Sequence, residues 1–200
     1  MDARNPVRLG IAAILFVAAS ASCAEAPSGP KDAIVLIIRH AEKPDTGAGL
    51  TPAGEQRAQA YARYFQDLTV DGARLTPDVI FAAKDSKASV RPRLTVEPFA
   101  KAAGLPVDNR FSSTEPVQLV AALHAMDAGK RILICWRHGD IPGLLRALGV
   151  EPKTVLPHGK WPDPVFDWVI LLRFDQNGAL IPGSARRIEE RLMPGDSTSN

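Results

Sequence analysis

Four nearly continuous apolar segments divide the chain at regular intervals. They lie at residues 33–38, 78–82, 131–136 and 168–174, and they are rich in Ile, Val and Leu. A strand with one exposed face alternates between apolar and polar residues, whereas a strand covered on both faces is apolar throughout. The pattern therefore predicts four strands at the centre of a buried sheet.

Between these segments, apolar residues recur at the spacing i, i+3, i+4, i+7, which is typical of one face of an α-helix. The spacing occurs four times, in the sets Tyr61, Tyr64, Phe65 and Leu68; Val96, Phe99, Ala100 and Ala103; Leu119, Ala122, Leu123 and Met126; and Ile141, Leu144, Leu145 and Leu148. Thr51 and Pro52 have the residue types of a helix N-cap and first turn, and Gly104 those of a helix end. The pattern predicts four helices.

Strands that alternate with helices favour a parallel-rich sheet with helices on both faces. We therefore predict an α/β fold, a three-layer α/β/α sandwich with a mostly parallel central sheet. Asn177 and Gly178 predict a hairpin turn after the last apolar segment. The expected organisation is a tether at residues 24–32, a domain at 33–182 and a polar C-terminal tail at 183–200.

Composition narrows the function classes only in part. The 200 residues are 46% hydrophobic and 23% charged, and the formal net charge is +2. Such a composition is ordinary for a folded domain, and so small a charge gives no electrostatic reason to expect nucleic acid as a partner. The two cysteines, Cys23 and Cys135, are too few for a disulfide-stapled scaffold.

The first 23 residues have the order of a secretory signal. Arg4 and Arg8 precede an apolar run at residues 9–19, and the small residues 20–23 follow. The run is shorter than the roughly 20 apolar residues that span a bilayer. We therefore expect residues 1–23 to be a signal peptide and the rest of the chain to be exported.

Two cleavage positions fit this signal. One lies after Ala21, because Ala19 and Ala21 match the small-residue pattern. The other lies before Cys23, because Ala21, Ser22 and Cys23 resemble the end of a bacterial lipoprotein signal, although Ser20 departs from that pattern. The mature protein is accordingly expected in the periplasm, or anchored to a membrane only through a lipid on Cys23.

The candidate chemistry lies where two of the predicted strands end. Arg39 and His40 follow the segment 33–38, and Arg137 and His138 follow the segment 131–136. Ligands of such sheets bind beyond the carboxyl ends of the strands. The planar guanidinium of arginine suits phosphoryl oxygens, and a neutral histidine can attack phosphorus. The two pairs predict phosphoryl transfer without a metal or other cofactor.

Four motifs in order resemble those of the histidine phosphatase superfamily, in the branch that contains phosphoglycerate mutases and small bacterial phosphohistidine phosphatases. They are Arg39-His40-Ala41-Glu42, Leu50-Thr51-Pro52-Ala53-Gly54, Arg91-x-x-x-Thr95 and His138-Gly139. The resemblance covers residues 33–175. The chain departs from the family where Ala41 replaces glycine, and Arg93 competes with Arg91 for the role of the second arginine.

The resemblance implies roles for single residues. His40 would be the phosphorylated nucleophile, with His138 beside it, and Arg39 and Arg91 would bind the phosphoryl oxygens. Glu115 would be the general acid, because it lies near the family's offset from the second arginine. Two alternatives stay open here: Asp140 as the acid, and Glu115 as a carboxylate that merely favours the start of a helix.

The expected function is therefore an exported, metal-independent histidine phosphatase. It would hydrolyse a phosphomonoester or a phosphohistidine through a phosphohistidine intermediate, and its partner would be a small phosphorylated substrate. The alternative is a non-catalytic exported module that binds a phosphorylated ligand in the same anion pocket. A mutase is disfavoured by export and by the short chain, and the sequence does not name the substrate.

Overall fold

A computed structural model describes residues 29–196, so the expected signal peptide, Cys23 and most of the expected tether lie outside the described residues. The central sheet has six strands in the order β5-β4-β6-β1-β7-β8. Their bounds are β1 (Ile34–Arg39), β4 (Val79–Ala82), β5 (Val107–Asp108), β6 (Arg131–Trp136), β7 (Trp168–Arg173) and β8 (Arg186–Glu189). Strands β5, β4, β6 and β1 are parallel, and β7 is antiparallel to both of its neighbours, β1 and β8.

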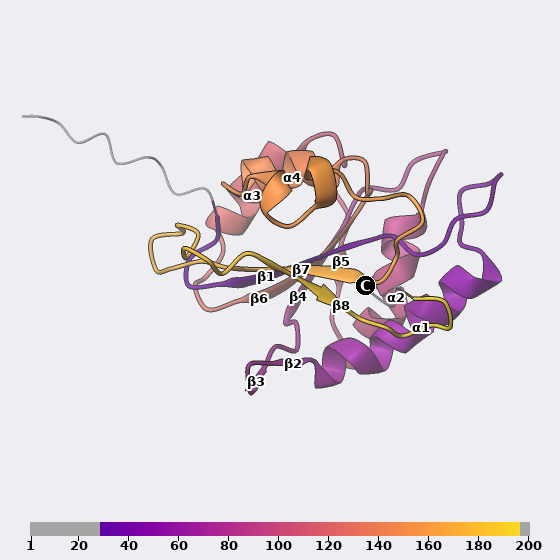
Figure 1. Cartoon of the computed structure of the whole chain (residues 1–200), viewed down its shortest axis with the longest axis horizontal. Helices are drawn as coiled ribbons and strands as arrows, with labels where there is room; N and C mark the ends of the chain where they lie inside the picture. The colour runs from indigo at the N-terminus through magenta and orange to yellow at the C-terminus, as the bar shows by residue number, and fades with distance from the viewer. Residues whose placement is uncertain (1–28, 197–200) are drawn as a thin grey trace, which may run out of the picture.

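Four helices cover the two faces of this sheet. They are α1 (Pro52–Asp67), α2 (Arg91–Ala103), α3 (Pro116–His124) and α4 (Ile141–Ala147). In Figure 1, α3 and α4 lie above the sheet and α1 lies below it, and α2 shares a buried cluster with α1. The predicted three-layer α/β/α sandwich with a mostly parallel sheet is confirmed.

The alternation of side chains along β1 explains why its sequence is apolar throughout. Leu36 and Ile38 are buried in one cluster with residues of α1 and α2, whereas Val35 and Ile37 are buried in another with residues of α3 and α4. Each fully buried side chain of this kind stabilises the fold by about 1.5–3 kcal/mol. The two-sided burial also holds the carboxyl end of β1 in a fixed place.

Two helix ends have the predicted chemistry. The Thr51 hydroxyl accepts a hydrogen bond of 3.1 Å from the backbone N–H of Gly54, and Pro52 opens α1. Gly104 ends α2 with φ at 66°, in the left-handed region that favours glycine. A turn also follows β7, where the N–H of Gly178 donates to the carbonyl of Asp175.

The sheet continues beyond the predicted end of the domain at residue 182. Strand β8 pairs antiparallel with β7, inside the segment expected to be a polar tail. Strand β8 is a short edge strand of four residues, two of which are arginines. It therefore lacks the apolar run from which the other strands were predicted. The sequence also did not predict three strands of two residues each, because so short a segment shows no pattern. They are β5, β2 (Thr69–Val70) and β3 (Ala73–Arg74).

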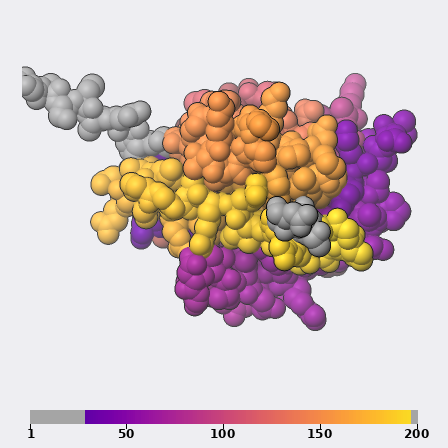
Figure 2. Space-filling model, in the orientation of Figure 1, coloured from indigo at the N-terminus to yellow at the C-terminus, as the bar shows by residue number. Residues whose placement is uncertain are grey.

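The described C-terminal segment returns to the surface of α1. Figure 2 shows it in yellow, between the purple region of α1 and the orange residues near 150. Asp196 accepts hydrogen bonds from the buried Arg57 of α1. Within residues 29–196, no helix combines the length and the apolar character needed to cross a membrane.

Candidate active site

The pairing of β1 with β6 brings the two Arg-His pairs together. The parallel register places Arg39 opposite Trp136, so His40 and Arg137 leave the same sheet edge side by side. The rings of His40 and His138 lie 5.8 Å apart between centroids, with 72° between their planes. The two pairs therefore form one site, at the edge where ligands of parallel sheets bind.

His40 has one ring nitrogen engaged by the backbone. Its Nδ1 lies 2.8 Å from the carbonyl oxygen of Ala41, which can only accept, so Nδ1 carries the proton of the neutral ring. Nε2 then keeps its lone pair. Burial, followed by the positive charge of Arg39, lowers the pKa of His40 to about 4. The imidazole is therefore a neutral nucleophile near pH 7.

The low pKa of His40 predicts its titration. We expect the ring to stay neutral as the pH falls past 6.5, the ordinary value for histidine, and to gain its proton near pH 4. NMR titration of the four histidines checks this, and the resonance missing from His40→Ala assigns the signal. A midpoint at or above 6.5 for that signal would contradict the neutral, desolvated state.

Arg39 is buried, with 1% of its surface exposed, and it holds the loop formed by residues 162–166. Its Nη1 donates to three backbone carbonyls of this loop at 3.2, 2.7 and 2.9 Å, those of Pro162, Asp163 and Val165. Its guanidinium carbon lies 3.9 Å from the ring centroid of Phe166. Among the described residues, its Nε–H has no hydrogen-bond partner. A buried N–H of this kind suits an anionic oxygen.

A chain of hydrogen bonds runs from Arg39 through His138 to Asp163. Arg39 Nη2 lies 3.3 Å from His138 Nδ1, and His138 Nε2 lies 2.7 Å from Asp163 Oδ1. A guanidinium can only donate, so His138 Nδ1 accepts and Nε2 carries a proton toward Asp163. Burial, followed by the charge of Arg39, lowers the pKa of His138. The neutral His138 therefore presents one donor, its Nε2–H.

Sequence reasoning missed Asp163 and its loop. The signal is weak, because Asp163 lies between two prolines in a polar connection. The loop reaches the site because β7 lies next to β1 in the sheet. The order of the elements along the chain does not predict which strands pair.

Arg91 begins α2 and is tied to the end of β1. The hydroxyl of Thr95 accepts from the N–H of Ala41 at 2.9 Å and donates to the carbonyl of Arg91 at 2.8 Å. The guanidinium of Arg91 donates to the carbonyl of Gly49 at 2.9 Å, and its positive charge lowers the pKa of His40. Arg91 is therefore the arginine that α2 brings to the site.

Arg93, the competing arginine, is engaged elsewhere. Its guanidinium pairs with Asp85 at 2.8 Å and with Glu97 at 3.3 Å. Asp85 lies in the loop after β4 and Glu97 lies one helical turn further along α2, so the guanidinium of Arg93 is taken up by two carboxylates away from the histidine pair.

The two candidate acids differ in their surroundings. Glu115 is the exposed N-cap of α3, and its carboxylate accepts from Gln118 at 3.2 Å. Asp140 precedes α4, accepts from the Ser113 hydroxyl at 2.6 Å and lies 3.8 Å from Arg137. The carboxylate that contacts His138 is instead that of Asp163.

The segment after His40 is supported from α1. Glu42 accepts from Arg57 at 2.8 Å, and Arg57 is buried. A Cβ on Gly54 would lie 2.5 Å from the carbonyl oxygen of Glu42, so only glycine allows α1 to approach this segment. The second motif thus fixes the backbone around the nucleophile.

No group of three His, Cys, Asp or Glu side chains in residues 29–196 is arranged to hold a metal ion.

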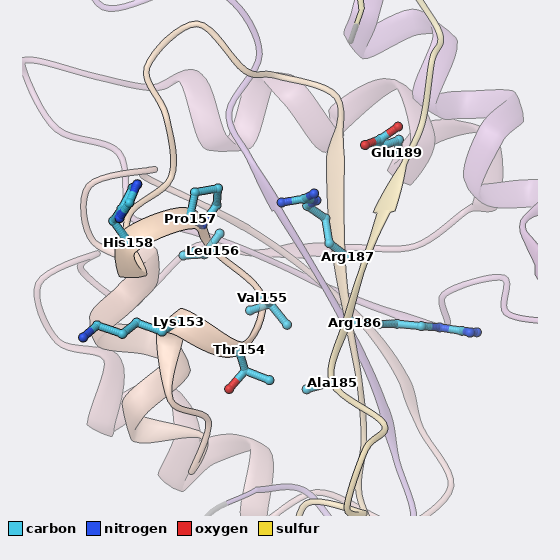
Figure 3. A pocket seen from close by; sticks show the side chains of 10 residues that line it. All are labelled: Lys153, Thr154, Val155, Leu156, Pro157, His158, Ala185, Arg186, Arg187 and Glu189. Atoms are coloured by element: carbon cyan, nitrogen blue, oxygen red, sulfur yellow. The ribbon is translucent and has the colours of Figure 1, made fainter. Parts of the chain in front are cut away.

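A hollow of about 690 Å³ lies away from the histidine pair, between β8 and two 3-10 turns, η1 (Pro152–Thr154) and η2 (Pro157–Gly159). Figure 3 shows Arg187 pointing toward this hollow and Lys153 and Arg186 pointing away from it. The hollow contains neither histidine of the pair.

Comparison with known proteins gives structural neighbours only. No protein-family model and no curated protein matches the sequence. A phosphoserine phosphatase from Entamoeba histolytica is 16% identical, with a TM-score of 0.52 over 76% of this chain and 96% of its own. A phosphoglycerate mutase from Plasmodium falciparum is also 16% identical, with a TM-score of 0.53 over 84% and 98%.

A third solved structure, the putative phosphohistidine phosphatase SixA from Agrobacterium tumefaciens, is 20% identical, with a TM-score of 0.50 over 75% of this chain and 96% of its own. These identities are too low to carry an activity across, but the shared architecture spans nearly the whole length of each neighbour. The chain therefore has the fold that these two phosphatase structures and the phosphoglycerate mutase structure share.

Proposed function

We propose that the chain is a histidine phosphatase that hydrolyses a phosphomonoester or a phosphohistidine. One observation carries the proposal: the Nδ1–H of His40 is bound to a carbonyl, which leaves the Nε2 lone pair available beside Arg39, Arg91 and His138. The neighbours named above as phosphatases of phosphoserine and phosphohistidine support the same reaction class.

In the first step, Nε2 of His40 attacks phosphorus. The N–P bond forms while the bond from phosphorus to the leaving oxygen or nitrogen breaks, and the leaving atom takes the electron pair and a proton. Arg39, Arg91 and the Nε2–H of His138 stabilise the charge on the remaining phosphoryl oxygens.

In the second step, a water oxygen attacks phosphorus and the N–P bond breaks. The electron pair returns to Nε2 of His40 and inorganic phosphate leaves. The carboxyl group that gave its proton to the leaving atom in the first step takes the water proton, so it ends the cycle as it began. No step requires a metal ion or another cofactor, because the cations that stabilise the phosphoryl group are side chains of the protein.

Release of phosphate from 4-nitrophenyl phosphate tests the proposal. We expect turnover by the wild type and the same rate in excess chelator. Binding of inorganic phosphate without turnover would instead favour the non-catalytic phosphate-binding module. Dependence on an added divalent metal ion would contradict the metal-independent scheme.

We propose Glu115 as the general acid, with Asp140 as the alternative. Proton donation matters most for a poor leaving group, and the loss of a general acid slows such a reaction by about 10²-fold or more. Glu115→Gln should therefore slow alkyl phosphate hydrolysis strongly and nitrophenyl phosphate hydrolysis weakly. Asp140→Asn should slow both modestly, because Asp140 lies two residues after His138.

Steady-state rates with both substrates distinguish the two carboxylates. The reverse pattern would assign the acid to Asp140. Small, equal effects at both positions would contradict a dedicated acid at either, and would favour a substrate with a good leaving group, such as phosphohistidine.

We also propose that the protein acts outside the cytoplasm on a small phosphorylated substrate. The apolar run at residues 9–19 after Arg4 and Arg8 should direct export. Mass spectrometry of the N-terminus from a bacterial host should find a start at Ser22 or a lipid on Cys23. A soluble cytoplasmic protein that begins at Met1 would contradict export.

A further inference from the structure

Asp163 contacts the candidate site although no motif includes it. Its carboxylate accepts from the Nε2–H of His138 at 2.7 Å, while its side chain is 87% exposed. The other ring nitrogen of His138 is held by Arg39. Asp163 therefore takes the one donor with which His138 could bind a phosphoryl oxygen.

We propose that Asp163 is a displaceable internal ligand of the phosphate site, a carboxylate that occupies the His138 donor until a phosphoryl group replaces it. The inference rests on the proposed function, because it assigns the displaced donor to the phosphate pocket. A carboxylate oxygen and a phosphoryl oxygen are both anionic acceptors of an N–H, so they compete for the same atom.

The loop that carries Asp163 is held independently of its side chain. Arg39 binds three loop carbonyls, and the indole N–H of Trp161 donates to the carbonyl of Val165 at 2.8 Å. The N–H of Glu190 donates to the carbonyl of Asp167 at 2.7 Å, just after the loop. Displacement therefore requires a rotation of one exposed side chain, and the loop does not have to open.

This arrangement makes Asp163 a specificity-determining residue. A ligand that enters must offer His138 a better acceptor than a carboxylate, and phosphate offers more negative charge and more acceptor oxygens. Once displaced, the Asp163 carboxylate stays at the mouth of the site on its fixed loop. It then disfavours ligands that carry a further anionic group there.

Binding of inorganic phosphate to the full chain measures the competition. Asp163→Ala removes both the charge and the acceptor, and Asp163→Asn removes the charge but keeps an acceptor oxygen. Exposed ion pairs are weak, so we expect phosphate affinity to rise roughly threefold to tenfold in Asp163→Ala and by a smaller factor in Asp163→Asn. Asp127→Asn, an exposed aspartate of the segment after α3, is the matched control and should leave affinity unchanged.

NMR titration of His138 provides a second readout, which a purely structural role of Asp163 would not move. The charged groups that act on His138 include Arg39 and Lys43, which lower its pKa, and Asp163, which raises it. The midpoint of His138 should therefore fall in Asp163→Asn and stay in place in Asp127→Asn.

The outcomes separate this inference from the proposed function. Equal or weaker phosphate binding in both Asp163 variants, with binding by the wild type intact, overturns the internal ligand alone. An unchanged His138 midpoint in Asp163→Asn also overturns it. No phosphate binding by any of the proteins overturns the phosphate pocket, and the internal ligand with it.

Discussion

His40→Ala should abolish hydrolysis of 4-nitrophenyl phosphate, with a loss in kcat on the order of 10⁴-fold or more. The expected loss is large because the variant removes the atom that forms the covalent bond to phosphorus. Rapid quenching of the wild type with labelled substrate should also trap an acid-labile phosphoryl group, and peptide mapping should place it on His40.

The matched control is His158→Asn. His158 is exposed and adopts φ of 51°, a conformation that asparagine tolerates, so the replacement should keep the fold and the activity. A labelled phosphoenzyme that persists in His40→Ala would assign the nucleophile elsewhere. Full activity in that variant would contradict the covalent scheme.

The central layer of the fold could be predicted because its strands carry their own signal. A strand such as β1, buried on both faces, is apolar at every position, and the helices repeat apolar residues at their own period. Two Arg-His pairs that directly follow such strands have to meet if β1 and β6 are neighbours, as they are. The meeting of the two Arg-His pairs could therefore be predicted from the sequence.

Strand β8 and the loop that carries Asp163 could not be predicted from such local patterns. Strand β8 pairs through backbone groups that any sequence supplies, and its charged residues resemble a tail. Asp163 reaches His138 only through the antiparallel placement of β7 beside β1. Both features depend on which strands become neighbours, which is decided by packing across the whole sheet.

The choice between Arg91 and Arg93 depends on local helix geometry, which the spacing of residues does reveal. The two residues differ by about 200° around a helix of 3.6 residues per turn, so only one of them can face the end of β1. Spacing to Thr95 favoured Arg91, and the hydrogen bond from the Ala41 N–H to Thr95 gives the physical reason.

Arg39→Lys should lower kcat/KM for 4-nitrophenyl phosphate by about 10³-fold, although lysine is also a cationic side chain. The planar guanidinium binds the loop carbonyls through Nη1 and His138 through Nη2, and it still has its Nε–H for a phosphoryl oxygen. An ammonium group also has three donors, but all three lie on one nitrogen and cannot reach acceptors that are arranged around three separate nitrogens. Burial lowers the pKa even of Arg39, to about 10, so a lysine there would be still easier to neutralise.

Arg93→Lys is the matched control, because Arg93 lies on the surface in pairs with Asp85 and Glu97 and should tolerate the change. Thermal unfolding of both variants separates a damaged fold from a damaged site. A folded Arg39→Lys protein should also bind inorganic phosphate more weakly than the wild type. If it kept both phosphate affinity and turnover, Arg39 would serve only to hold the 162–166 loop, and the phosphoryl group would have to be bound by Arg91 and His138 alone.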